Sequence, residues 1–437
     1  MSSASRGMRV AVAAAMLLLS ALDASARDIG AGYGFPIEDP YLATVLGTPA
    51  ALRAPLPADL DVEHRSLVLF DDREIPAVFW TQNDFSYSLA RQDGRAPLIF
   101  LIAGTGARYD SGKMAYLQAV FHQAGYHVVN VSSPTHPEFI VSGSSSSVPG
   151  YMKADVRDLY VAMQHIYAEI HSRVEVSDFY LSGYSLGGSQ SAFLAQLDSH
   201  EGAFKFKKVL LLNPSVDLFT SVNILDSFLS SVPGGARGVG DAIHDVFRRV
   251  TNYFHRNGRE SIDTELLYKI AEEEELSGDE LRTLIGVAFR ISSSEMLFSS
   301  DVMTGSHIVV EPETRLGVTT PLLPYFKFTA RWTWLNYLDD VLLPYWQRRE
   351  PGLTRESMIQ SVSMVAIEDY LKRATHVAVL HNADDLILGP GDLEWLERTF
   401  GDRATIYPVG GHCGNLMYRD NVERMLEFFA ASPGSGE

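Results

Sequence analysis

Apolar runs and amphipathic segments alternate along much of the chain. From Pro97 onward, short runs of continuous apolar residues, typical of strands covered on both faces, alternate with segments of helical periodicity. This alternation implies parallel crossovers and predicts a mostly parallel, doubly wound α/β sheet. The predicted strands are 62–70, 75–80, 85–91, 97–103, 126–131, 208–212, 376–380 and 404–407, and the predicted helices are 111–124, 152–171, 189–197, 390–400 and 415–430.

The alternation breaks between Asn213 and Lys372, where the pattern is almost wholly that of helices and loops. Ser277 and Glu280 have the spacing of a capping box, and Thr354 is predicted to cap a further helix. Aromatic residues crowd between Tyr325 and Trp346, where they belong either to the core of this helical block or to the wall of a pocket. One helical face is predicted from apolar residues at positions 243, 246, 247, 250 and 254.

The stretch from Phe179 to Gly188 carries the strongest chemical signal. An apolar, aromatic run ends abruptly in Gly-Tyr-Ser-Leu-Gly, and a helix-compatible segment follows at once. A nucleophile elbow needs this context of strand, sharp turn and helix. Gly183 and Gly187 lack Cβ atoms, so the strand end and the helix start can approach closely. Ser185 is therefore the candidate nucleophile. The alternative is a glycine-rich turn with no chemical role.

Composition narrows the possible partners. The length of 437 residues predicts either a large core with an insertion or two domains. The shares of hydrophobic and charged residues, 46% and 21%, are ordinary for a globular protein. Its formal net charge of −18 disfavours nucleic acid and anionic membrane surfaces as partners, because like charges repel. Cys413 is the single cysteine, which excludes an intrachain disulfide and a thiolate metal cluster.

The N-terminus has the pattern of an export signal. Arg6 and Arg9 form a basic region, an apolar segment covers 10–22, and Ala24-Ser25-Ala26 is a small-residue cleavage site. We expect residues 1–26 to be removed and the mature protein to be periplasmic or secreted, without an integral membrane segment. An uncleaved membrane anchor is the alternative. Residues 27–60 show no firm periodicity and are predicted to form an extended lead-in.

Together, the elbow and the interrupted alternation resemble an α/β-hydrolase that carries a helical cap. The resemblance covers about residues 62–216 and 373–431. It implies a hydrolase core in two parts, 27–216 and 373–437, with a helical cap at 217–372 inserted after the strand that follows the elbow. In that family the loop after this strand is a usual site for a cap.

The resemblance also implies a base and an acid in the chain order Ser, Asp or Glu, His. His412, in the Gly-Gly-His segment after the last predicted strand, has the position of the base. Asp385 is the favoured acid, because it abuts an aliphatic run after the strand at 376–380. Asp384 and Asp217 remain alternatives, and any of the three could instead be a helix cap or a turn residue.

Carbonyl attack also needs N–H donors for the oxyanion. The resemblance assigns this role to the backbone amides of Leu186 and Thr105, although the usual His-Gly is Ala103-Gly104 here. We expect Tyr184, beside the nucleophile, and His136, on the loop after an earlier strand, to contact the substrate.

The expected function is that of an exported serine hydrolase acting on a small-molecule ester or acyl substrate, with no metal and no organic cofactor. Ester cleavage is favoured because esters are the commonest substrates in the family. Two alternatives remain: an amide or peptide hydrolase that uses the same triad, and a non-catalytic binding module with this fold.

Overall fold

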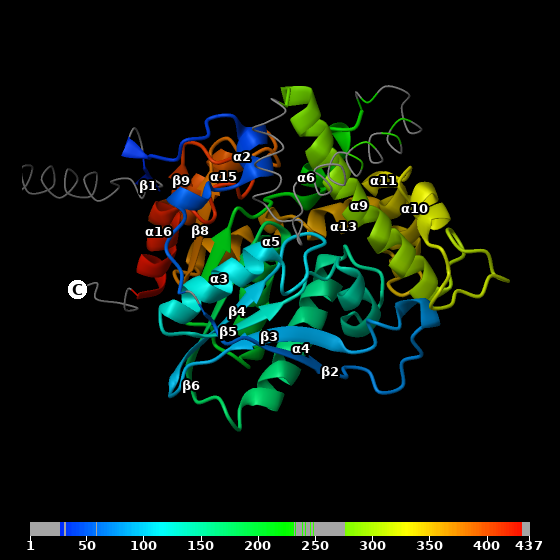
Figure 1. The fold of residues 1–437 in the computed structure, drawn as a ribbon, viewed down its shortest axis with the longest axis horizontal. Helices are drawn as coiled ribbons and strands as arrows, with labels where there is room; N and C mark the ends of the chain where they lie inside the picture. Colours follow the sequence, from blue (N-terminus) through cyan, green and yellow to red (C-terminus); the bar gives the residue numbers. More distant parts are fainter. Residues whose placement is uncertain are drawn as a thin grey trace, which may run out of the picture.

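The computed structural model describes residues 27–29, 32–57, 59–230 and 276–430, together with positions 232, 238, 241, 245 and 248. Within these residues, nine strands form one sheet in the order β1-β9-β8-β7-β6-β4-β5-β3-β2 (Figure 1). The strands are β1 (Arg27–Asp28), β2 (Glu63–Leu67), β3 (Phe85–Ala90), β4 (Ala96–Ile102), β5 (His127–Val131), β6 (Val176–Tyr184), β7 (Lys208–Leu212), β8 (Val377–Asn382) and β9 (Ala404–Tyr407).

Most of the sheet is parallel. Every neighbouring pair from β1 across to β5 is parallel, whereas β3 is antiparallel to both β5 and β2. The prediction of a mostly parallel, doubly wound sheet is therefore confirmed. Because parallel strands end at the same edge, the loops after β4, β6, β8 and β9 are brought together.

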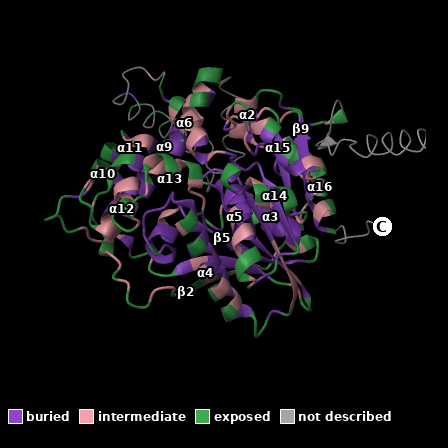
Figure 2. Cartoon of the chain, turned by 180° about the vertical axis from the view of Figure 1, so that it is seen from behind, coloured by how far each residue is buried: buried purple, intermediate pink, exposed green. Residues whose placement is uncertain are grey.

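Helices cover both faces of the sheet. Along β4, alternate side chains enter different apolar clusters: Leu98 and Phe100 lie in one, and Ile99 and Leu101 in the other. Figure 2 shows the buried strands beneath partly exposed helices. The first cluster includes side chains of α4 (Met152–Ile170), α5 (Leu186–Glu201) and α15 (Asp392–Phe400), and the second those of α3 (Gly112–Gln123) and α16 (Arg419–Ala430).

A helical block lies between β7 and β8, and Figure 1 shows most of it gathered at one side of the sheet. The predicted caps are confirmed: Ser277 and Glu280 form a capping box, and Thr354 caps a helix by accepting a hydrogen bond from the Ser357 amide. The described helices of the block are α6 (Leu218–Ser227), α9 (Gly278–Thr304), α10 (Leu323–Thr329), α11 (Trp334–Tyr337), α12 (Leu343–Gln347), α13 (Arg355–Ser361) and α14 (Glu368–Arg373).

A buried ion pair ties the block together. The Arg290 guanidinium on α9 lies 2.5 Å from the Asp226 carboxylate on α6, and their side chains are only 4% and 10% exposed. Asp226 also accepts a hydrogen bond of 2.6 Å from the Trp334 amide at the start of α11. One carboxylate therefore joins three helices that are far apart in the sequence.

Two predicted elements and one predicted boundary were wrong. Residues 75–80 do not form a strand: Pro76 lacks an N–H for a ladder, and a 3₁₀ turn follows at Ala77–Phe79. The lead-in is not simply extended, because Asp39 caps a helix, α2 (Pro40–Leu46), with Pro40 at its first position. The last helix begins at Arg419 rather than Asn415, because Asn415 is buried in a turn and hydrogen-bonded to Asn382.

Two predictions fall outside the described residues: the segment 1–26 and the helical face formed by positions 243, 246, 247, 250 and 254. None of the helices in the described ranges is both long and apolar enough to cross a membrane.

Replacing Asp226 by Ala is expected to lower the free energy of unfolding by about 3–5 kcal/mol, because it leaves the Arg290 charge buried and unpaired. The measurement is denaturant unfolding of the purified protein. Asp339→Ala is the matched control, since Asp339 pairs with Arg355 in the same block but is 45% exposed. That pair is expected to contribute about 0–1 kcal/mol. Equal losses in the two variants would contradict the role given to the buried pair.

Candidate active site

Ser185 lies at a strained turn between β6 and α5. Its backbone is in the left-handed half of conformational space, with φ 56° and ψ −126°, which is uncommon for a residue with a side chain. A Cβ added at Gly183 would lie 2.3 Å from the Gly187 carbonyl oxygen, and one at Gly187 would lie 2.3 Å from the Ile102 carbonyl oxygen. Both glycines are therefore required for this turn, as the sequence predicted.

His412 reaches the serine from the loop after β9. Its Nε2 atom lies 2.8 Å from Ser185 Oγ, within hydrogen-bond distance. The loop is held by the N-terminal segment, because the His412 amide donates to the Thr44 hydroxyl at 2.8 Å. Gly411, with φ 55°, touches the same segment: a Cβ there would lie 2.2 Å from the Pro40 carbonyl oxygen. No pattern in the sequence predicted this support from α2.

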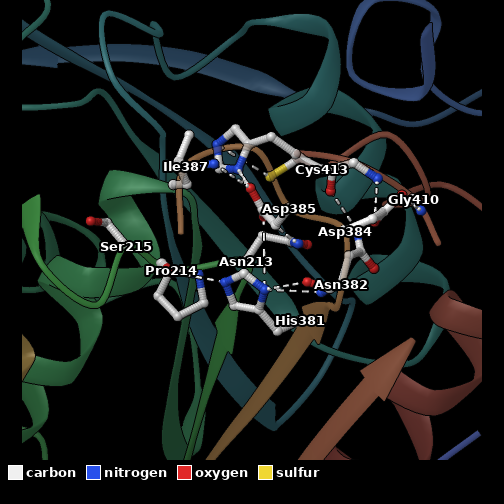
Figure 3. A network of polar contacts seen from close by, with 12 residues as sticks. Asn213, Pro214, Ser215, His381, Asn382, Asp384, Asp385, Ile387, Gly410 and Cys413 are labelled. Carbon is white, nitrogen blue, oxygen red and sulfur yellow. Dashed lines mark hydrogen bonds and ion pairs between the residues drawn. The ribbon is translucent and has the colours of Figure 1, made fainter. Parts of the chain in front are cut away.

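Asp385 lies on the other side of the imidazole. Both of its carboxylate oxygens are 3.0 Å from His412 Nδ1, and the side chain is fully buried. It also accepts hydrogen bonds from the Asn213 side chain at 3.0 Å and from the Ile387 amide at 3.1 Å. Figure 3 shows Asn213 and His381 beside this carboxylate. The geometry therefore brings Ser185, His412 and Asp385 into one hydrogen-bonded chain.

The two alternative acids lie elsewhere. Asp384 accepts hydrogen bonds from the Gly410 amide at 3.1 Å and the Gly411 amide at 2.9 Å, so it holds the loop that carries His412 (Figure 3). Asp217 caps α6 by accepting from the Thr220 amide at 2.7 Å. Neither contacts the imidazole of His412.

Asn213 was not identified from the sequence as a site residue. It follows β7 directly and has φ 45°, a conformation that Asn tolerates better than most residues. Its amide donates to the carboxylate of Asp385, so its backbone conformation and its hydrogen bond belong to the same arrangement. An Asn placed directly after a buried strand was the signal that could have pointed to it.

The two charged partners shift each other's pKa. Burial alone would lower the pKa of His412, but the Asp385 carboxylate raises it above its ordinary value of 6.5. Burial alone would raise the pKa of Asp385, but His412 holds it below 3.8. Asp385 therefore stays ionised and favours an imidazole that carries an additional proton.

The two predicted oxyanion donors lie close to the serine. Leu186 is the first residue of α5, so its amide has no partner within the helix and lies at the positive end of the helix dipole. Gly104 brings the turn with Thr105 against Ser185, since an added Cβ would lie 3.1 Å from Ser185 Cβ. Thr105 and Leu186 line the same cavity, which α6 and α9 enclose from the other side.

Tyr184 and His136 stay predictions as substrate contacts, and neither lines this cavity. Tyr184 is buried, packs in the apolar cluster that contains Met114 and Cys413, and its ring supports Gly104. His136 accepts a hydrogen bond from the Glu138 amide at 3.2 Å, and burial lowers its pKa to about 4. Among the described residues, no group of three or more His, Cys, Asp or Glu side chains is arranged to hold a metal ion.

No protein-family model matches the chain, and a search of curated proteins found no match either. Among solved structures, the chain is similar to Est1E from Butyrivibrio proteoclasticus, with 12% identity, a TM-score of 0.39, and coverage of 84% of this chain and 99% of that chain. It is also similar to a thermostable esterase from Pseudomonas putida ECU1011, with 13% identity, a TM-score of 0.41, and coverage of 91% and 97%. A thioesterase domain from the curacin biosynthetic pathway has 13% identity and a TM-score of 0.37, with coverage of 85% and 100%.

Likenesses with TM-scores of 0.37 to 0.41 carry no conclusion about this chain, so its fold is assigned from its own geometry. The strand order, the parallel core of the sheet and the sharp turn after β6 together give this chain an α/β-hydrolase fold.

Proposed function

We propose that this chain is a serine hydrolase that cleaves carboxylic esters through Ser185, His412 and Asp385. The observation that carries the proposal is the continuous hydrogen-bonded chain from the Ser185 hydroxyl through both nitrogens of His412 to a buried carboxylate. An activated serine needs this arrangement: a base within hydrogen-bond reach, and an acid that orients the base.

In the first half of the reaction, Ser185 Oγ attacks the ester carbonyl carbon while His412 Nε2 takes the hydroxyl proton. Asp385 holds the Nδ1 proton of the imidazole and stabilises the imidazolium that forms. The tetrahedral intermediate collapses when the C–O bond to the alcohol breaks and His412 returns its proton to the leaving alkoxide. An acyl-enzyme on Ser185 and a free alcohol result.

In the second half, His412 takes a proton from water, and the hydroxide that forms attacks the acyl carbonyl carbon. The second tetrahedral intermediate expels Ser185, which recovers the proton from His412, and a carboxylic acid leaves. In both halves the developing oxyanion is bound by the amides of Leu186 and Thr105. Such a donor is worth about 10²–10³-fold in kcat.

The helical block acts in this proposal as a cap over the site. Helix α9 packs directly on the turn that carries Thr105, because a Cβ added at Gly106 would lie 2.2 Å from Ser292 Oγ. Apolar residues of the block, among them Phe289 and Met296, face the cavity beside Thr105 and Leu186. A small, uncharged ester group fits such a lining better than a sugar or a charged peptide.

Export is part of the same proposal, because the first 26 residues have the charge and apolar pattern of a cleavable signal. Expression of the full chain in a bacterium with two membranes is expected to release a mature protein whose N-terminus is Arg27. Edman or mass-spectrometric sequencing of the released protein measures this. Recovery of the uncleaved chain in the membrane fraction would contradict it.

Hydrolysis of esters is expected to depend on Ser185. The mature protein should cleave nitrophenyl esters faster than matched anilides, and Ser185→Ala should lose most of kcat, on the order of 10⁶-fold at full effect. Ser182→Ala is the matched control, because Ser182 is buried and donates to the Leu210 carbonyl. This variant should keep the esterase activity of the wild type. Labelling by a fluorophosphonate probe reports the nucleophile independently. Folded wild-type protein that neither labels nor cleaves any ester would point to a binding module, and faster anilide cleavage to an amidase.

The pH dependence of kcat/KM should follow His412. The base must be neutral to accept the serine proton, and its pKa lies above 6.5 because of Asp385. The value of kcat/KM should therefore rise with pH, and the midpoint of this acid limb should lie above pH 6.5. Asp385→Asn should move that limb to lower pH and reduce kcat by about 10⁴-fold. Asp384→Asn disturbs the loop but not the contact with the imidazole. It should therefore reduce kcat far less and leave the acid limb of the pH profile at the same pH. Equal effects of the two variants would contradict the choice of Asp385.

A further inference from the structure

Two cavities beside the candidate active site share one lining residue. The inner cavity has a volume of about 20 Å³ and is lined by Thr105, Leu186 and residues of α6, α9 and α11. The outer cavity has a volume of about 640 Å³ and lies between α4, α5 and the end of α12. Among the described residues that line these cavities, Met152 alone lines both.

Met152 is held firmly in this position. It is the first residue of α4 and is only 2% exposed. The preceding turn is fixed because the Gly150 amide donates to the Asp155 carboxylate at 2.8 Å. Gly150 has φ +108° and fits closely against Trp334, whose ring would lie 2.9 Å from an added Cβ. The backbone that carries Met152 is therefore tied to the helical block, and Met152 is the lining residue that the two cavities share.

We propose that Met152 is a specificity-determining residue that restricts the ester substrate to a short acyl group. The inference rests on the proposed function and deepens it. In the tetrahedral intermediate the oxyanion faces the amides of Leu186 and Thr105, and the inner cavity begins at these two residues. We assign this cavity to the acyl group and the opposite, solvent-facing side of Ser185 to the alcohol.

The size of the inner cavity limits the acyl chain. A volume of about 20 Å³ accommodates roughly one water-sized sphere, so the methyl group of an acetyl fills it. A longer chain would have to pass Met152. Beyond it, the outer cavity is lined partly by apolar side chains, among them Tyr151, Phe193 and Trp346, which suit an alkyl chain. Removing the Met152 side chain should therefore join the cavities and open a path for medium-length acyl groups.

The test compares kcat/KM for nitrophenyl acetate, butyrate and octanoate in wild type and Met152→Ala. Wild type should prefer acetate. In Met152→Ala the ratio of kcat/KM for octanoate to that for acetate should rise by at least about tenfold, since even one additional methylene accommodated in an apolar pocket is worth about tenfold or more. Met152→Val removes less volume and should raise the ratio by a smaller factor. Met152→Leu conserves the volume and should leave the ratio unchanged.

Met163→Ala is the matched control. Met163 lies on the same helix and is fully buried, but it lines neither cavity, so its loss loosens the core without joining them. Thermal unfolding of each variant reports whether the protein is folded. A second series, alkyl acetates from ethyl to octyl, varies the alcohol instead of the acyl group. The dependence of kcat/KM on alcohol length should be the same in wild type and Met152→Ala.

The outcomes are distinguishable. An active wild type whose acyl-length profile is the same in folded Met152→Ala and Met152→Val would overturn the role of Met152 and leave the proposed hydrolase intact. A rise of the same size in Met163→Ala, a change confined to the alcohol series, or a wild type that prefers octanoate would also overturn it. A wild type that cleaves no ester in either series would overturn the proposed function, and the acyl selectivity with it.

Discussion

The backbone conformation of Ser185 is the constraint on which the rest of the site depends. A non-glycine residue at φ 56° and ψ −126° costs on the order of 1–3 kcal/mol, and it persists only where the surroundings leave no alternative. Here the Ser185 amide donates to the Leu212 carbonyl at the end of β7, while Gly183 and Gly187 allow the strand and the helix to touch. Three neighbouring strand ends therefore determine where one hydroxyl points. A hydroxyl on an ordinary helix or strand would not be held over the sheet edge, within reach of a loop that comes from the far end of the chain.

The buried carboxylate of Asp385 imposes a second constraint, because an ionised group that is buried away from solvent needs hydrogen-bonding or charged partners in the protein. His412, Asn213 and the Ile387 amide provide them, from loops that follow three different strands. The neighbouring Asp384 points the other way and binds the glycine amides that shape the histidine loop. Two adjacent aspartates thus perform different tasks: one orients the imidazole, and the other fixes the backbone that carries it. Each of the two acids therefore has its own hydrogen-bonding partners at a crowded, low-dielectric position.

The local sequence pattern predicted those elements whose structure depends on interactions between residues close in the sequence. The continuous apolar runs at 208–212 and 404–407 coincide with β7 and β9, since a strand buried on both faces leaves no ambiguity. The elbow was predictable because only glycine fits its two flanking positions. The choice between Asp384 and Asp385 was open, because one residue of spacing decides which side chain faces the imidazole. The support from Thr44 and the position of Asn213 depend on contacts across hundreds of residues, which no local pattern encodes. The aromatic stretch was ambiguous for the same reason.

The structure gives that aromatic stretch both of its expected roles. The Tyr337 and Tyr345 hydroxyls donate to the carbonyls of Pro149 and Ser146, at 2.8 and 3.0 Å, so they anchor the helical block on the segment that leads into α4. Trp334 and Trp346, from the same stretch, line the inner and outer cavities. The same stretch therefore both holds the helical block in place and lines the two cavities. Because the anchor and the cavity walls share one segment, the helical block cannot shift on the core without changing both cavities.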